Sequence, residues 1–389
     1  MIIPSAMRLQ RILKRHLRSV CAFLMLLISG SLMSAERPDA RVSLADRSVA
    51  ETLLRLPDFN LRGRPDLIEK LDRYLRANQG TTRYFQLVRQ FKLKDRSNEL
   101  LAIVLSRPGT TPGTWAAETL VQFDKRELLE QTTRHADTDR AVAAVRGLAS
   151  VGDADTQAYF VETLKKGVLP VETLNAIATA LSDQPEGEQF LAEWVASGNL
   201  PPQLAFTVGN LLHSSEIAAH RKIATRHLPR PKTSGGNPLP PLKDLVGRSG
   251  DPEHGRTLFF SKAQCAGCHQ VDREGKQIGP DLTEIGSKLS KEVLYTSILD
   301  PSAAISHNYE NHEVVTVDGK IEKGILLSRD TTGTTLKDAE GIVRSFSHAE
   351  IESFRKLPLS LMPDGIEKKL TVRELIDLVQ FLASLKNSR

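Results

Sequence analysis

Cysteine is scarce in this chain of 389 residues, which has three, and the scarcity restricts its thiol chemistry. Cys21 lies in an apolar N-terminal stretch, so Cys265 and Cys268 are the only cysteines in the rest of the chain. A structural zinc site normally takes four protein ligands, and no second C-x-x-C or H-x3-H pair is present to complete one. A thioredoxin-like dithiol would need a βαβ frame, which the sequence around Cys265 does not provide.

Methionine is also rare after residue 35, because four of the five methionines fall within residues 1–35. Met362 is the only one in the remainder of the chain, and it lies in the turn-rich stretch Ser360–Gly365, just before the last predicted helix. A thioether in a loop is an unusual core residue and a good axial ligand for haem iron. Met362 is therefore a candidate metal ligand.

The two remaining cysteines belong to the motif C-x-x-C-H at Cys265–His269, the signature of covalent c-type haem attachment. Two thiols at this spacing can add to the two vinyl groups of one haem, and the next residue then presents an imidazole to the iron. We therefore predict one covalent haem c, tethered by Cys265 and Cys268, with His269 as the proximal ligand and Met362 as the distal one. A zinc site, a redox dithiol and a chance match are the alternatives.

Residues 1–35 have the features of a secretory signal peptide. Basic residues come first, an unbroken apolar run follows from Val20 to Ile28, and small residues lead to a cleavage position near Ala35. An uncleaved membrane anchor is the alternative, but the stretch is short for a bilayer and is interrupted by serine and glycine. We therefore predict a periplasmic or otherwise exported protein, with a membrane contact only if the leader is uncleaved.

The formal net charge of +5 comes entirely from this leader. Residues 1–35 hold five of the 52 basic residues and no acidic one, so the rest of the chain carries 47 residues of each sign. A balanced chain gives no electrostatic argument for nucleic-acid binding. We predict no nucleic-acid partner.

Residues 36–230 have a helical period, interrupted by proline, glycine and aspartate, and they show no strand-like alternation of any length. Pro65, Pro170 and Pro201 mark helix starts, and Asp153 and Asp155 are predicted N-caps. Successive short helices predict an α-solenoid of HEAT-like type. A Pro/Gly-rich linker at 231–250 separates it from the remainder. This helical region has no pattern of catalytic or metal-binding residues.

Residues 251–389 are predicted to form a cytochrome c-like helical domain. Asp251-Pro252 starts its first helix, and Thr371 with Glu374 forms a capping box at its last one. Gly255 would allow those two helices to approach closely, as they do in cytochromes c. Between them, about residues 308–356, alternating apolar residues around Asp318-Gly319 predict a small antiparallel β insertion. The whole chain is therefore predicted to be mainly α.

Three histidines, at positions 307, 312 and 348, lie in or beside this insertion. One of them could replace Met362 as the sixth ligand, because bis-histidine haem sites also occur. The sequence leaves this alternative open.

Several segments resemble the haem-binding domain of Planctomycetes and Verrucomicrobia type: 264–270 (QCAGCHQ), 278–282 (IGPDL), 298–301 (ILDP), Asp318-Gly319 and 360–363 (SLMP). The similarity extends over about residues 251–385, and the preceding helical region also looks like that family's arrangement. The resemblance implies an exported c-type cytochrome, often fused to a propeller-like sugar dehydrogenase. It also implies that Pro280 gives its backbone carbonyl to the proximal histidine.

The function that we expect is single-electron transfer, because an iron with both axial positions filled has no open site for a substrate. This chain has no propeller, so its redox partner would be a separate protein, such as a periplasmic sugar or alcohol dehydrogenase. Two alternatives need an open or displaceable sixth position: a haem peroxidase-like enzyme and a haem-based sensor. The sequence favours an electron carrier over an enzyme.

Overall fold

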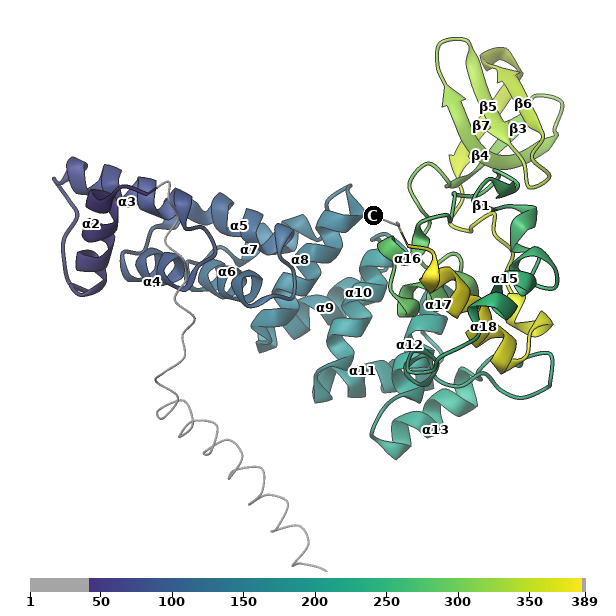
Figure 1. The fold of residues 1–389 in the computed structure, drawn as a ribbon, viewed down its shortest axis with the longest axis horizontal. Helices are drawn as coiled ribbons and strands as arrows, with labels where there is room; N and C mark the ends of the chain where they lie inside the picture. The colour runs from purple at the N-terminus through teal and green to yellow at the C-terminus, as the bar shows by residue number, and fades with distance from the viewer. Residues whose placement is uncertain (1–41, 387–389) are drawn as a thin grey trace, which may run out of the picture. The chain divides into compact units, whose positions relative to one another are not determined.

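The computed structural model describes residues 42–386, so the predicted signal peptide lies outside the described residues. The described chain is mainly helical and carries small antiparallel sheets (Figure 1), which confirms that part of the predicted fold class. It divides into two compact units, Met1–Phe91 and Lys92–Arg389. No helix within residues 42–386 is long and apolar enough to cross a bilayer.

The first unit contains three described helices: α2 (Leu44–Leu54), α3 (Pro65–Ala77) and α4 (Thr82–Gln90). Pro65 occupies the first helical position of α3, as the sequence predicts. Helix α2 packs on α3 and α4, and the guanidinium of Arg73 on α3 donates to both carboxylate oxygens of the buried Asp46 on α2, at 2.8 and 3.1 Å. Because this bidentate pair joins two helices, it fixes their relative rotation.

The second unit begins with a run of helices: α5 (Ser97–Ser106), α6 (Thr111–Gln122), α7 (Arg126–Thr132), α8 (Thr138–Val151), α9 (Ala154–Lys166), α10 (Val171–Ser182), α11 (Pro185–Ala196), α12 (Ala205–His213) and α13 (Ala218–His227). Each packs against helices that are close to it in sequence, such as α5 on α6 and α12 on α13. Asp153 caps α9, accepting from the Thr156 N–H at 2.9 Å and pairing with Arg126. Asp155, also predicted as a cap, lies inside the first turn of α9 instead.

The proline-rich segment after α13 packs on the C-terminal part of the unit. Leu239 and Leu245, the latter on the short α14 (Leu242–Val246), are buried in its hydrophobic core. The Ser234 N–H donates to the Leu370 carbonyl at 2.9 Å. This segment therefore connects α13 to the C-terminal part of the unit and also contributes residues to the hydrophobic core of that part.

Helices α15 (Pro252–Phe260), α17 (Lys291–Leu299) and α18 (Val372–Ser384) supply most of the buried residues of that core, and α16 (Ile285–Lys288) packs against it through the half-buried Ile285. Helices α15 and α18 cross in direct contact. A Cβ atom at Gly255 would lie 2.1 Å from the Asp377 carbonyl oxygen and 2.7 Å from Cβ of Phe381. The close approach predicted for Gly255 is therefore present, and only glycine permits it.

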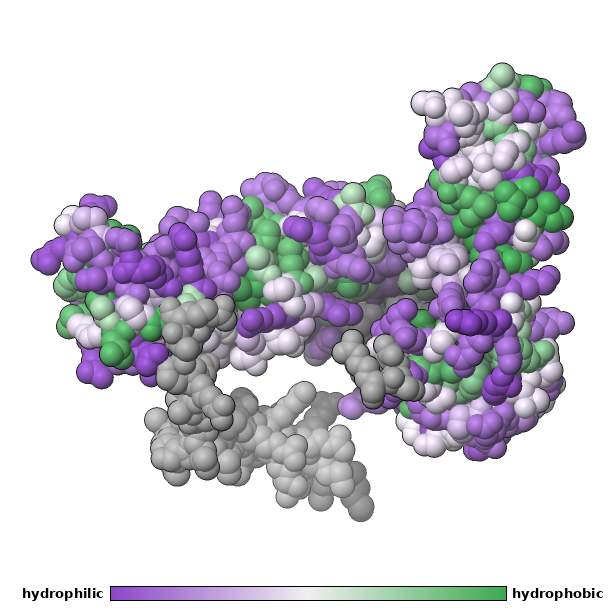
Figure 2. All heavy atoms as spheres, turned by 45° about the horizontal axis from the view of Figure 1, so that its top comes forward, coloured by the Kyte–Doolittle hydropathy of each residue, from purple (hydrophilic) through white to green (hydrophobic). Residues whose placement is uncertain are grey.

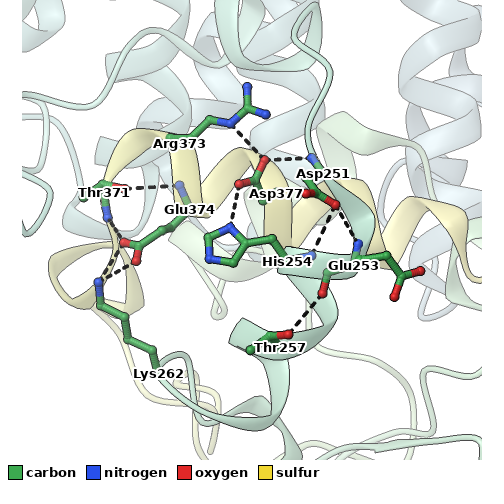
Figure 3. Close-up of polar contacts among 9 residues, drawn as sticks. All are labelled: Asp251, Glu253, His254, Thr257, Lys262, Thr371, Arg373, Glu374 and Asp377. Atoms are coloured by element: carbon green, nitrogen blue, oxygen red, sulfur yellow. Dashed lines mark hydrogen bonds and ion pairs between the residues drawn. The ribbon is translucent and has the colours of Figure 1, made fainter.

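Polar contacts secure the same crossing (Figure 3). The carboxylate of Asp377, a residue 2% exposed, accepts from the Asp251 N–H at 2.8 Å, lies 2.9 Å from Nδ1 of His254 and pairs with Arg373 at 3.1 Å. Asp251 in turn caps α15, and Thr371 with Glu374 forms the predicted capping box of α18. A buried, satisfied carboxylate in the middle of α18 thus holds the start of α15.

The β insertion is a five-stranded antiparallel sheet: β3 (Asn311–Thr316), β4 (Ile321–Arg329), β5 (Gly333–Lys337), β6 (Val343–Ser347) and β7 (Ile351–Lys356), in the order β6-β5-β4-β3-β7. The turn between β3 and β4 contains Gly319 at φ 81°, which satisfies the predicted Asp-Gly hairpin. A second, two-stranded sheet of β1 (Gln270–Val271) and β2 (Glu274–Gly275) follows the C-x-x-C-H motif.

Candidate functional site

The motif Cys265–His269 folds as a tight turn after α15. Gln264 adopts left-handed backbone angles, with φ 60°, and Cys265–Gly267 forms a 3₁₀ turn. The N–H groups of Cys268 and His269 then donate to the Cys265 carbonyl at 3.0 and 2.9 Å. The turn brings both thiols and the imidazole to one pocket, which all three residues line.

A second segment, residues 276–282, is hydrogen-bonded along this turn. The N–H groups of Ile278 and Gly279 donate to the Cys268 carbonyl at 2.9 and 2.8 Å, and the N–H of Lys276 donates to Ala266 at 3.0 Å. These bonds place the carbonyl oxygen of Pro280 at 2.9 Å from Nδ1 of His269.

This contact determines the tautomer of His269. A carbonyl oxygen can only accept, so Nδ1 carries the proton and Nε2 keeps its lone pair. Burial lowers the pKa of His269, which keeps the ring neutral at pH 7. A neutral imidazole, oriented by a backbone acceptor, is the form that binds iron.

Gly279 fits against the same ring, a role that was not predicted from the sequence. A Cβ atom at this position would lie 2.6 Å from Cε1 and 2.9 Å from Nδ1 of His269. Any larger residue would therefore displace the imidazole. The position of Gly279 directly before Pro280 could have indicated this role, because a loop whose carbonyl reaches the histidine must pass close to the ring.

The pocket beneath the motif has about 1100 Å³ of empty space when the open solvent at its mouth is counted. Its lining is mostly apolar and, apart from His269, contains no acidic or basic side chain: Phe259, Cys265, Cys268, His269, Ile278, Gly279, Pro280, Leu282, Ile285, Leu289, Leu294, Ser297, Ile298, Pro301, Ala304, Ile305, Ser306, Tyr309, Ile325, Ala339, Ser360, Leu361, Met362 and Leu382. A mainly apolar cavity with few polar groups is typical of a cofactor site.

Met362 lines the same pocket as His269, although 93 positions separate them in the sequence. Its N–H donates to the Ser360 hydroxyl at 3.1 Å, and the Ser360 N–H donates to the hydroxyl of Ser302 at the same distance. The loop is thereby attached to the chain that leaves α17. The structure thus brings all five predicted site residues, Cys265, Cys268, His269, Pro280 and Met362, to one cavity.

None of the three histidines considered as alternative ligands lines this cavity. The side chain of His307 is 88% exposed, and that of His312 stacks on Phe354 with ring centroids 5.2 Å apart. Nε2 of His348 lies 2.8 Å from the Asp330 carbonyl, in the β4–β5 turn. Their positions argue against a bis-histidine site.

The thiol environment also argues against the metal and dithiol alternatives. Burial raises the pKa of the Cys265 thiol to about 12, whereas reactive dithiols have lowered values. Within the described part of the chain, no group of three or more His, Cys, Asp or Glu side chains is arranged to hold a metal ion. The two thiols and a neutral imidazole beside an apolar cavity fit covalent haem c.

Comparison with known families agrees with this geometry. Residues 252–320 match the family model described as Cytochrome c. The matched segment contains α15, the C-x-x-C-H motif and Pro280, and it ends before Met362. No curated protein matches the chain. The chain therefore contains a cytochrome c domain, which implies covalently bound haem c and a haem-binding electron carrier.

Proposed function

We propose that this protein is an exported c-type cytochrome that carries one haem c and passes single electrons to or from a separate periplasmic dehydrogenase. One observation carries the proposal: the C-x-x-C-H motif and Met362 line the same apolar cavity. The described residues contain one such motif, so one haem is expected for each chain.

Each residue of the site has a distinct role in this proposal. Cys265 and Cys268 tether the cofactor, Pro280 orients the imidazole of His269 through its carbonyl, and Met362 offers its thioether from the loop before α18. Haem supplies a one-electron couple when it is bound, and thioether ligation raises its reduction potential. The apolar lining excludes water and so adds to the same effect.

The helical region at 36–230 is proposed to be a HEAT-like docking domain. In the second unit, the packing of α5–α13 against sequence neighbours supports this, because solenoid repeats contact mainly their neighbours. Electron-transfer contacts are typically small and transient, so an additional surface would help to hold a partner. The family resemblance points to a sugar or alcohol dehydrogenase as that partner.

The test is to titrate the purified holoprotein potentiometrically and then to expose its ferrous form to carbon monoxide. We expect a reversible one-electron couple, no carbon monoxide spectrum and no turnover of hydrogen peroxide, because His269 and Met362 would occupy both axial positions. Rapid carbon monoxide binding, or peroxide turnover, would contradict the electron carrier and favour a sensor or a peroxidase.

A further inference from the structure

The five-stranded sheet contributes directly to the cavity. The family match at 252–320 includes only some of the residues that line this cavity. Ile325 on β4 is 4% exposed and lines the cavity, and so does Ala339 in the turn between β5 and β6. Figure 2 shows hydrophobic residues gathered where the sheet meets the helical core. The sheet is therefore one wall of the site.

The turn at residues 338–342 is internally ordered. The Asp338 carboxylate accepts from the N–H groups of Glu340 at 3.1 Å and Ile342 at 2.7 Å, and it pairs with Arg344 at 2.8 Å. The backbone closes the turn as well, since the Asp338 N–H donates to the Ile342 carbonyl at 3.0 Å. A turn with this many internal bonds holds Ala339 in a defined place.

The same turn contacts the segment that orients His269. Directly before the turn, the ammonium of Lys337, the last residue of β5, donates to the Gln277 carbonyl at 2.6 Å. Gly341 packs on Ile278, where a Cβ atom would lie 3.3 Å from Cδ1. Because Ile278 and Gly279 directly precede Pro280, the turn covers the proximal side of the cavity.

Both connections of the sheet to the helical core also line the cavity. Residues 304–306 and Tyr309 precede β3, and residues 360–362 follow β7. The Ser302–Ser360 hydrogen bond joins these two connections. The sheet therefore touches the proximal segment at one place and continues into the Met362 loop at another.

We propose that the sheet, through its 338–342 turn, closes the haem pocket and sets the electrostatic environment of the iron. Ala339 is the residue that we assign to this role, because it lines the cavity and is still exposed at the mouth. The sheet is thus a positioning and tuning element rather than a separate module. This inference depends on the proposed function, because it concerns the same haem.

The test places a charge of either sign at position 339. Ala339→Lys should stabilise the ferrous state and Ala339→Glu the ferric state, because oxidation adds one positive charge to the iron. At an effective dielectric of about 20 and separations on the order of 10 Å, each change should move the ferrous-to-ferric ratio at fixed potential about tenfold, in opposite directions. Spectroelectrochemical titration of the holoprotein measures the ratio.

Val317 provides a matched control, since it is 66% exposed in the β3–β4 turn and does not line the cavity. Val317→Lys and Val317→Glu make the same charge changes, and solvent screening should keep their effects below about twofold. The proposal would be wrong if the ferrous-to-ferric ratio changed equally at positions 317 and 339, or if both substitutions at position 339 changed it in the same direction. The absorption spectrum of the wild-type protein is recorded first, and a spectrum without covalent haem contradicts the proposed function. Intact haem, with ferrous-to-ferric ratios that the substitutions at position 339 leave unchanged, contradicts only this inference.

Discussion

Met362→Ala is expected to abolish the far-red absorption band that thioether ligation gives to ferric haem, and to lower the reduction potential. Axial ligands adjust haem potentials over about 0.8 V, so we expect a fall of roughly 200 mV. At about 59 mV for each tenfold change, this is on the order of a thousandfold loss in the ferrous-to-ferric ratio. The freed position should also admit carbon monoxide. Absorption spectra and a redox titration measure each effect.

Leu361→Ala is the control for that substitution, because Leu361 lines the same cavity from the same loop and keeps the thioether in place. Leu361→Ala should retain the far-red band, and its reduction potential should stay close to that of the wild-type protein. If Met362→Ala keeps the band, or if both variants lose it to the same extent, Met362 is not the sixth ligand.

Gly279→Ala is expected to displace the proximal imidazole. The new methyl group would lie 2.6 Å from Cε1 of His269, and the backbone at this point is fixed by the Cys268 carbonyl. Overpacking of this kind costs about 1–3 kcal/mol, which corresponds to a shift of up to roughly 150-fold toward a weakly ligated or unligated histidine. The visible spectrum should show partial loss of the low-spin form and a lower midpoint of thermal unfolding.

Gly267 provides the matched control, because it lies in the C-x-x-C-H turn of the same site and a Cβ atom there would meet nothing within 4 Å. Gly267→Ala should leave the spectrum and the unfolding midpoint nearly unchanged. Equal effects at the two glycines would show that the loss at Gly279 does not come from its contact with His269.

Local sequence rules predict much of this fold, because they depend on near neighbours. The Asp318-Gly319 hairpin, the Asp251 cap and the Thr371 capping box are each present, and the five-stranded sheet lies within the predicted insertion. The short β1–β2 pair was not predicted. Short or weakly amphipathic helices are harder to predict from hydrophobic periodicity. Leu129 is the one buried residue of α7, and α13 has few apolar residues.

The cavity wall could not be derived in the same way. Which residue of a strand or turn faces a cofactor depends on how the sheet docks, and no local pattern distinguishes Ile325 or Ala339 from their neighbours. The role of Gly279 likewise depends on a ring that is ten positions away in the sequence. By contrast, Cys265, Cys268 and His269 are recognised from spacing alone, because their chemistry is local.

The measurement that tests the central claim most directly is the mass of the denatured chain, expressed with the cytochrome c maturation machinery. We expect the mass of the polypeptide plus one haem, and a haem-free mass for a Cys265→Ala/Cys268→Ala double variant. A wild-type chain without haem, or a double variant that keeps haem after denaturation, would contradict covalent attachment at this motif.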